Sequence, residues 1–551
     1  MYRTIGQQIL KELEILGVEY IYGVPSGNTG YIYDCIEDYN MKLIVTKSES
    51  GATYSAARYS DLSGKLGVSI LSGGVGATNG LNGIADAYVN KLPMLIITGN
   101  TTTQSRGKGC VQELETTNIT KSITKYSKTI LNDKEIIKEL KLAIKLATTK
   151  PCGPVHISIP MDLPMKTYDE GYTNSEIETN ENEIINDDES IKIAIDKLNN
   201  TEKGLILVGH GAKDLNNEID YLSEKLGWYV MTTPQGKSNV NHINPLYIGN
   251  FGFYSSDFAN NYIKSKDIET ILVLGSSLGE SATQNFDENF YKNRTIIQID
   301  HDVEILNRNS VENKLPVLYN LKDAIQIINN NVKEKDLKEK YIFDKSELNK
   351  QYINNHDGIS IRRVLETLPN ILNKSTTYLC DIGEFMNHTF KYLQLPIESK
   401  FVSSLNYGSM GHSIGGVVGA ALSGKTNKYA VIVGDGSYYM NGMELLTAKE
   451  YNLPIIYFII NNAKYNYVDK GQSFVFGRTI PSIHFNRVSI AKISESMGIK
   501  SYQINVLEEL ENISSELHNC NEPIVVELVT YGTEESGECD RFKAIAKQTD
   551  K

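Results

Sequence analysis

The stretch that decides the fold reads Tyr429-Ala-Val-Ile-Val433, then Gly434-Asp435-Gly436-Ser437, and later Pro454-Ile-Ile-Tyr-Phe-Ile-Ile460 before Asn461-Asn462. A helix-like segment around Met443 to Tyr451 separates the two apolar runs. Two buried strands joined by a helix form a β-α-β unit, in which the loops after both strands emerge at the same edge of the sheet. Ligands bind at that edge in α/β folds.

The loops at this edge carry oxygen ligands suited to a cation. Asp435 follows the first strand and Asn462 follows the second, so both side chains are expected at the same edge. Magnesium takes one or two protein oxygens together with phosphate oxygens and water. Gly434 and Gly436 allow backbone N–H groups to approach a diphosphate closely, and Ser437 adds a hydroxyl. The pattern therefore predicts a cation that is bound through a diphosphate.

Similar apolar runs recur along the chain and end in glycine or small polar residues. They lack the two-residue alternation of half-exposed strands, and amphipathic stretches such as Gln7 to Leu16 and Leu222 to Leu226 lie between them. This pattern indicates buried parallel strands with crossover helices, hence an α/β fold. The runs are Val68 to Leu71, Met94 to Ile97, Leu205 to Val208, Ile271 to Leu274, Ala430 to Val433 and Ile455 to Ile460.

Length and composition indicate three domains. A chain of 551 residues is too long for one core, since domains usually contain about 100 to 200 residues. Residues 169–189 carry nine acidic residues and no basic one, and residues 329–355 are polar and rich in Asn and Lys, so both stretches are predicted to be linkers. The predicted domains are residues 1–168, 190–328 and 356–535, followed by a tail at 536–551.

The charge and the cysteines exclude several classes of protein. A net charge of -12 argues against a nucleic-acid-binding surface. The six cysteines show no metal-ligand or redox spacing, which indicates reduced thiols. The N-terminus has no apolar leader region, and no apolar run approaches the length of about 18 residues that a membrane span needs. We therefore expect a cytoplasmic protein that binds neither nucleic acid nor membranes.

Most of the chain resembles a known superfamily, the thiamine diphosphate enzymes that include acetolactate synthase, pyruvate oxidase and pyruvate decarboxylase. The spacing from Gly-Asp-Gly to Asn-Asn carries this resemblance, and the acetolactate synthase large subunit is the most similar member. Further matching stretches are Gly17-Val-Glu-Tyr-Ile-Tyr-Gly-Val-Pro25, Gly73-Gly-Val-Gly-Ala-Thr-Asn79, Gly83-Ile-Ala-Asp-Ala-Tyr88 and Leu92-Pro-Met-Leu-Ile-Ile-Thr-Gly99. The resemblance implies three doubly wound parallel-sheet domains, which bind the pyrimidine, form a Rossmann-like module and bind the diphosphate with Mg²⁺.

The resemblance also assigns roles to individual residues. Glu49, in Leu43-Ile-Val-Thr-Lys-Ser-Glu49, matches the catalytic glutamate, whose carboxyl group favours the pyrimidine tautomer that removes the proton from the thiazolium. Gly408 and Met410 match the segment that grips the pyrimidine, with Met410 as the wedge that bends the cofactor. Further contacts with the diphosphate side are implied for Gly383, Glu384 and Phe385, and the backbone carbonyl of Lys464 is implied as a third metal ligand beside Asp435 and Asn462.

The branch of the superfamily is suggested by missing proton donors. Pyruvate decarboxylases use acidic or histidine side chains at positions that here hold Gly27, the segment Val111-Gln112-Glu113, and Val468. A site without these donors protects the carbanion from protonation, which leaves it to attack a second carbonyl. The resemblance therefore implies carboligation, with Gln112 pointing at the reacting centre. The expected substrates are a 2-oxo acid, pyruvate above all, and a carbonyl acceptor.

The sequence also departs from acetolactate synthase at several positions. The tryptophan that favours 2-oxobutyrate is replaced by Gly471, Ser48 stands where a histidine is usual, and Gly275-Ser-Ser-Leu-Gly-Glu280 replaces the arginine-containing flavin stretch. This last replacement argues against bound FAD. These departures leave open a specialised carboligase that uses another acceptor. Two further alternatives are a simple decarboxylase that releases an aldehyde and a degenerate regulatory subunit. Since the family builds each site between two subunits, a homodimer or homotetramer is expected.

Overall fold

The computed structural model describes residues 3–169, 186–309, 311–335, 344–345, 348, 357–535 and 541–549. These residues form three six-stranded sheets, and every pairing between the strands is parallel. Each sheet has helices on both faces, so the predicted α/β fold with three doubly wound sheets is confirmed. Most of the two predicted linkers lies outside the described residues.

The N-terminal sheet has the strand order β2-β1-β3-β4-β6-β5. Its strands are β1 (Tyr20–Gly23), β2 (Lys42–Val45), β3 (Gly67–Leu71), β4 (Met94–Asn100), β5 (Tyr126–Thr129) and β6 (Pro154–Pro160). Its helices are α1 (Ile5–Ile15), α2 (Gly30–Tyr33), α3 (Glu49–Ser63), α4 (Val75–Asn79), α5 (Leu81–Val89), α6 (Thr116–Thr120) and α7 (Ile136–Thr148).

The middle sheet has the order β12-β11-β10-β7-β8-β9, which places its topological switch point between β7 and β10. Its strands are β7 (Gly204–Val208), β8 (Tyr229–Thr232), β9 (Tyr247–Asn250), β10 (Thr270–Leu274), β11 (Thr295–Asp300) and β12 (Lys314–Leu318). Its helices are α8 (Asp188–Asn200), α9 (Asn216–Leu226), α10 (Asp257–Tyr262), α11 (Glu288–Tyr291), α12 (Val303–Arg308) and α13 (Leu321–Asn331).

The C-terminal sheet has the order β14-β13-β15-β16-β18-β17. Its strands are β13 (Thr376–Cys380), β14 (Lys400–Val402), β15 (Lys428–Gly434), β16 (Ile455–Asn461), β17 (Lys500–Ile504) and β18 (Ile524–Val529). Its helices are α14 (Ile361–Ile371), α15 (Phe385–Tyr392), α16 (His412–Leu422), α17 (Asp435–Asn441), α18 (Glu444–Glu450), α19 (Asn466–Phe476), α20 (Ile490–Ser496), α21 (Leu507–Asn512) and α22 (Ser514–His518). The predicted tail contains one further helix, α23 (Arg541–Thr549).

The β-α-β unit predicted for residues 429–462 is present. Strands β15 and β16 are adjacent and in register from Tyr429 opposite Ile455 to Gly434 opposite Ile460. Nearly every residue of both strands is buried, because helices cover both faces of the sheet. The loops after β15 and β16 therefore lie side by side at one edge.

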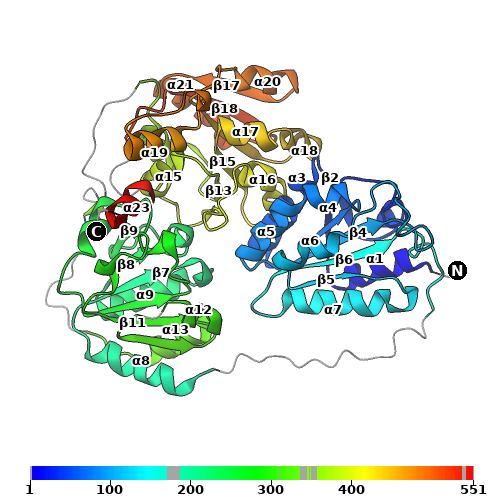
Figure 1. Cartoon of the computed structure of the whole chain (residues 1–551). Helices are drawn as coiled ribbons and strands as arrows, with labels where there is room; N and C mark the ends of the chain where they lie inside the picture. Colours follow the sequence, from blue (N-terminus) through cyan, green and yellow to red (C-terminus); the bar gives the residue numbers. More distant parts are fainter. Residues whose placement is uncertain are drawn as a thin grey trace.

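The N-terminal and C-terminal domains share one hydrophobic core. One face of each sheet contributes to it, and helices α3 and α16 pack against each other between the sheets (Figure 1). The two helices approach closely because Gly419 has no side chain: a Cβ there would overlap the backbone carbonyl of Ser55. This packing sets the position of the first residues of α3 relative to the C-terminal domain.

The middle domain lies beside this pair, with α23 next to it (Figure 1). It has its own core on each face of its sheet. Within the described part of the chain, no helix is both long and apolar enough to cross a membrane.

Candidate active site

The first group of candidate residues surrounds helix α4 of the N-terminal domain. Glu49 is the first residue of α3, with Ser48 as its N-cap, and its Oε2 accepts a hydrogen bond from the side-chain amide of Asn79 at 3.2 Å. Its other carboxylate oxygen faces Gly76, where a Cβ would lie 3.3 Å away. The half-buried Glu49 carboxylate therefore lies beside α4, next to Gly76 and Asn79.

Gln112 lies at the other end of α4. Its backbone has a positive φ of 63°, its carbonyl packs against Gly74, and its side-chain oxygen accepts a hydrogen bond from Asn28 at 3.2 Å. The neighbouring Glu113 carboxylate is turned into its own loop, where it accepts hydrogen bonds from the N–H groups of Gly109 and Cys110 at 2.9 and 3.0 Å. Two N-terminal candidates, Glu49 and Gln112, are thus close to one short helix.

The second group lies at the carboxyl edge of the C-terminal sheet. Asp435 is buried at the end of β15, and its Oδ2 accepts hydrogen bonds from the N–H groups of Asn462 and Ala463 at 3.1 and 2.7 Å. Its Oδ1 accepts from the N–H of Gly436 at 2.8 Å. Burial raises the pKa of the Asp435 carboxyl to about 6, although these backbone donors oppose the rise.

The donor set at this edge fits a magnesium ion. A carboxylate offers about four acceptor positions, and backbone N–H groups occupy three of those on Asp435. The side chain of Asn462 and the carbonyl of Lys464 follow within the same loop. Oxygen ligands of this kind suit Mg²⁺. No cluster of three or more His, Cys, Asp or Glu side chains suited to a metal occurs in the described ranges, so a metal here would depend on this mixed set.

Met410 lies against the same edge. Its Cε is 3.1 Å from the position that a Cβ on Gly436 would take, and Gly408 before it has a positive φ of 73°. The segment is anchored by Asp381, a fully buried carboxylate that accepts hydrogen bonds from the N–H groups of Gly411 and Ser413, both at 2.8 Å. Asp381 thus caps α16 and fixes the residues that follow Met410.

The loop after β13 lies at the same edge of the C-terminal sheet. Phe385 packs beside Gly383 and Gly434, and a Cβ on Gly434 would lie 3.1 Å from the Phe385 ring. The Ser437 hydroxyl donates to the carbonyl of Ile382 at 3.3 Å. Because Gly383 and Gly434 have no side chains, the Phe385 ring can pack directly against the backbone at both positions.

The Glu384 carboxylate in this loop is paired with residues of helix α19. Its carboxylate contacts the Lys470 ammonium at 2.9 Å and the Asn466 amide at 3.1 Å. Burial alone would raise the pKa of Glu384, but the charges of Lys470 and His388 outweigh it and lower the pKa to about 2. Glu384 therefore ties the loop after β13 to helix α19.

Two residues that the sequence analysis missed connect the two groups. The buried Glu444 of α18 accepts hydrogen bonds from the N–H groups of Lys47 and Ser48, the two residues that precede Glu49. The Asn441 side chain accepts from the Ser50 hydroxyl at 2.9 Å and donates to the carbonyl of Gly411 at 3.1 Å. The sequence signal that could have identified them is an acidic residue and an amide residue in the short helices that follow Gly-Asp-Gly.

Comparison with known proteins matches all three domains to one family. Residues 3–119 match the thiamine pyrophosphate enzyme N-terminal TPP binding domain, residues 191–328 the central domain, and residues 381–528 the C-terminal TPP binding domain. An acetolactate synthase large subunit of Buchnera aphidicola is 30% identical over 527 residues, which cover 92% of this chain and 90% of the relative. The chain belongs to the thiamine pyrophosphate enzyme family.

Other relatives carry the same description. A probable acetolactate synthase large subunit of Methanococcus aeolicus is 29% identical over 95% of this chain and 91% of its own length. An acetolactate synthase large subunit of Lactococcus lactis is 28% identical over 96% of this chain and 92% of its own length. The resemblance inferred from the motifs is thereby confirmed.

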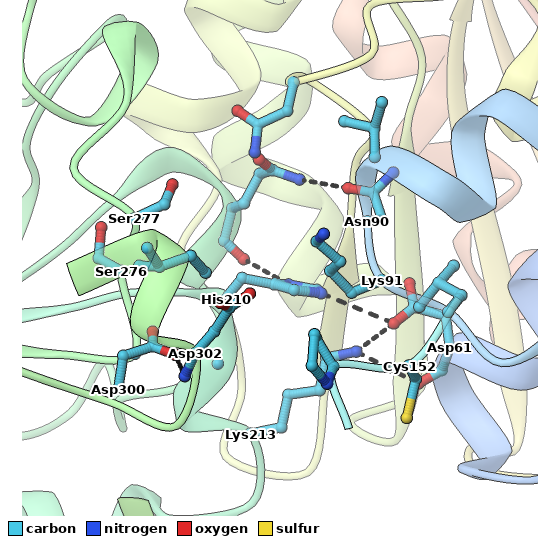
Figure 2. A pocket seen from close by; sticks show the side chains of 18 of the residues that line it. Asp61, Asn90, Lys91, Cys152, His210, Lys213, Ser276, Ser277, Asp300 and Asp302 are labelled. Atoms are coloured by element: carbon cyan, nitrogen blue, oxygen red, sulfur yellow. Dashed lines mark hydrogen bonds and ion pairs between the residues drawn. The ribbon is translucent and has the colours of Figure 1, made fainter. Parts of the chain in front are cut away.

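The middle domain of this thiamine pyrophosphate enzyme borders a cavity of about 460 Å³ (Figure 2). Asp300 and Asp302 line it from the end of β11, while Asp61, Lys91 and Cys152 line it from the N-terminal domain. Segment 275–280 brings no cation to this cavity. Of the three lysines that line the cavity, Lys213 is paired with Asp61, while Lys91 and Lys150 are further cations on its wall. The expectation against FAD stays a prediction, which the flavin absorbance of the purified protein would test.

Proposed function

We propose that this enzyme, with thiamine diphosphate and Mg²⁺, decarboxylates a 2-oxo acid, pyruvate above all, and transfers the two-carbon unit to a carbonyl acceptor. When bound, thiamine diphosphate supplies the carbanion and the electron sink for this chemistry. The relatives named acetolactate synthase support the proposal. The observation that carries it is the convergence of Asp435, Asn462 and Met410 at one edge of the C-terminal sheet.

Each side of the site has a distinct task in this proposal. The Glu49 carboxyl would hold the proton at the pyrimidine nitrogen, and Met410 with Gly408 would support the bent cofactor. Asp435, Asn462 and the Lys464 carbonyl would bind Mg²⁺, which in turn would hold the diphosphate together with Gly383, Gly434, Gly436 and Ser437. Phe385 would border the diphosphate, and Glu384 would act through its contact with α19.

The surroundings of Gln112 favour carboligation over simple decarboxylation. Its side chain contacts the neutral amide of Asn28, and the nearby Glu113 carboxylate is occupied by backbone N–H groups. Those N–H groups also lower the pKa of Glu113, so it would be a poor proton donor at neutral pH. Gln112 would therefore face the reacting carbon without a protonating carboxyl group from Glu113 beside it.

The experiment is carbon dioxide release from pyruvate by the purified enzyme with thiamine diphosphate and Mg²⁺, with products identified by mass spectrometry. Acetolactate is the expected product, and the Glu49→Gln and Asp435→Asn variants should lose it while the surface variant Glu37→Gln keeps it. Free acetaldehyde as the sole product would instead indicate a decarboxylase. No turnover with any 2-oxo acid would indicate a regulatory subunit.

The assembly and location are also proposed. We infer a homodimer or homotetramer, because apolar side chains of Tyr439, Met440 and Met443 are exposed next to the candidate site. Light scattering of the purified protein would measure the assembly state. A cytoplasmic location agrees with the five described cysteines, which are all free thiols.

A further inference from the structure

Asn28 lies in a turn at the carboxyl edge of the N-terminal sheet. The N–H of Thr29 closes this turn by donating to the carbonyl of Ser26 at 3.2 Å. A Cβ on Gly99, near the end of β4, would overlap the backbone carbonyl and the Oδ1 atom of Asn28, so Asn28 packs directly against the backbone of this strand. Ligands bind at this edge in α/β folds. The Asn28 side chain is therefore held where a substrate is expected.

The orientation of the Asn28 amide follows from its partners. Its Oδ1 accepts hydrogen bonds from the Ser26 hydroxyl at 2.9 Å and from the backbone N–H of Gly73 at 3.4 Å. A backbone N–H can only donate, so the oxygen of the amide faces Gly73 and the NH2 group faces away from it. That NH2 group meets the Oε1 atom of Gln112 at 3.2 Å. Asn28 is thus a donor toward Gln112.

This contact in turn sets the direction of the Gln112 amide. Because Oε1 accepts from Asn28, the Nε2 atom with its two N–H groups faces away from Asn28. The backbone of Gln112 is held as well, since its carbonyl packs against Gly74. The side chain is exposed, and within the described residues it makes no second hydrogen bond. Gln112 therefore offers a bound substrate a donor rather than an acceptor.

A donor at this position suits the transfer half of the proposed reaction. In that step the electron pair of the two-carbon unit forms the new carbon–carbon bond, and the π electron pair of the acceptor carbonyl moves onto its oxygen, which takes up a proton from solvent. Donors aimed at an oxygen that gains negative charge are commonly the largest single contribution to catalysis. An amide oxygen in the same position would repel that charge.

We propose that Asn28 is a positioning residue, which holds the Gln112 amide so that its NH2 group donates to the carbonyl oxygen of the acceptor. This inference rests on the proposed carboligase function and on the proposed place of Gln112 at the reacting centre. The release of carbon dioxide precedes the entry of the acceptor, so it does not need this donor. A change at Asn28 should therefore slow the transfer of the two-carbon unit and leave the first release of carbon dioxide unchanged.

The variant Asn28→Asp reverses the direction of the hydrogen bond with almost no change of shape. An ionised carboxylate can only accept, so the Gln112 amide should turn its NH2 group toward position 28 and its oxygen toward the acceptor. One carboxylate oxygen can still accept from the N–H of Gly73 and from the Ser26 hydroxyl. The variant Asn28→Ala instead leaves the Gln112 amide free to take either orientation.

The measurement is the ratio of acetolactate to acetaldehyde, which are formed with thiamine diphosphate, Mg²⁺ and saturating pyruvate and quantified by mass spectrometry. Asn28→Asp should lower this ratio by about a hundredfold, and Asn28→Ala should lower it less. An unchanged ratio in Asn28→Asp overturns this proposal alone. Absence of acetolactate with the unaltered enzyme overturns the carboligase function and this proposal with it.

A second readout separates positioning from a general distortion of the site. Rapid-quench measurement of carbon dioxide release in the first turnover should give the wild-type rate in Asn28→Asp and in Asn28→Ala. A first turnover that is slowed as strongly as the transfer step would show that the whole site is disturbed, and it would overturn the proposal.

Two control variants separate the direction of the amide from the added charge. Asn132→Asp places the same charge in the same domain at an exposed N-cap, where Asp caps as well as Asn, and should leave the ratio unchanged. An equal fall of the ratio there would attribute the effect to charge and overturn the proposal. The double variant Asn28→Asp with Gln112→Ala should lower the ratio no further than Gln112→Ala alone, because Asn28 acts through the Gln112 amide. Additive losses would also overturn the proposal.

Discussion

The Oε1 atom of Glu444 lies 3.0 Å from the backbone nitrogen of Ser48, so a carboxylate of the C-terminal domain fixes the segment that leads into Glu49. The same carboxylate accepts hydrogen bonds from the N–H of Lys47 and from the Thr447 hydroxyl, the latter at 2.8 Å. Burial raises the pKa of Glu444, while these donors oppose the rise. The position of the proposed catalytic acid therefore depends on a domain other than its own.

Removal of the Glu444 carboxylate should misplace Glu49. We expect Glu444→Ala to lower kcat for carbon dioxide release by up to about a hundredfold, because small displacements of reacting groups are costly. Glu444→Gln keeps one acceptor oxygen and should recover part of the rate. The control is Glu450→Ala in the same helix, whose exposed carboxylate contacts the Lys47 ammonium at 2.6 Å. Wild-type kcat in Glu444→Ala would contradict the proposed role.

Asn441 should matter for cofactor affinity. Its side chain donates to the carbonyl of Gly411, directly after Met410, so Asn441→Ala should loosen the segment proposed to support the pyrimidine. A lost hydrogen bond of about 1 kcal/mol predicts a Kd for thiamine diphosphate that is higher by about fivefold. Isothermal titration calorimetry measures this Kd. Ser50→Ala keeps the hydrogen bond from Asn441 to Gly411, so it should change the Kd less. An equal rise of the Kd in both variants would argue against a role of the Asn441–Gly411 hydrogen bond.

The sequence predicted the parts of the site that depend on strand order. Asp435 and Asn462 follow consecutive runs of buried apolar residues, and adjacent parallel strands bring their ends together. The 3.1 Å hydrogen bond from the Asn462 N–H to Asp435 is the outcome of that local pattern. The expected approach of a diphosphate to Gly434 and Gly436 stays a prediction.

The parts that the sequence did not predict depend on partners far away in the chain. Glu444 is 396 residues from Ser48, and no periodicity relates the two. Glu384 was expected at the diphosphate, but Lys470, 86 residues later, determines where its carboxylate lies. Residues 536–551 were expected to be a tail, yet α23 packs on Gly471. In each case tertiary contacts, which a single sequence does not contain, decide the direction of a side chain.

Asp381 should be a main determinant of stability in the C-terminal domain. Its carboxylate accepts from the N–H groups of Ile382, Gly411 and Ser413, each at 2.8 Å. Asp381→Asn replaces one acceptor oxygen by a donor that would face a backbone N–H, and we expect a loss of about 2 to 3 kcal/mol. Urea unfolding measures it. As a comparison, Asn320→Ala removes the side chain that caps the N-terminus of α13 and should cost about 1 kcal/mol.

A buried histidine should make the N-terminal domain sensitive to acid. The His156 ring is fully buried between the hydroxyls of Thr98 and Thr120, at 2.9 and 2.7 Å, and burial lowers its pKa to about 4. Because the unfolded chain has a histidine pKa of about 6.5, it binds the proton first. The His156 contribution to stability is therefore present above pH 6.5 and lost as the pH falls toward 4.

The expected loss at pH 4 is roughly 3 kcal/mol, since one pKa unit corresponds to about 1.4 kcal/mol. Urea unfolding between pH 7 and pH 4, followed by a spectroscopic probe in the N-terminal domain, measures it. His156→Gln cannot take up the proton, so its stability should fall less steeply over this range, although it starts lower at pH 7. His518→Gln alters an exposed histidine and should leave the slope unchanged. Equal slopes in the wild type and in His156→Gln would show that other groups cause the acid sensitivity.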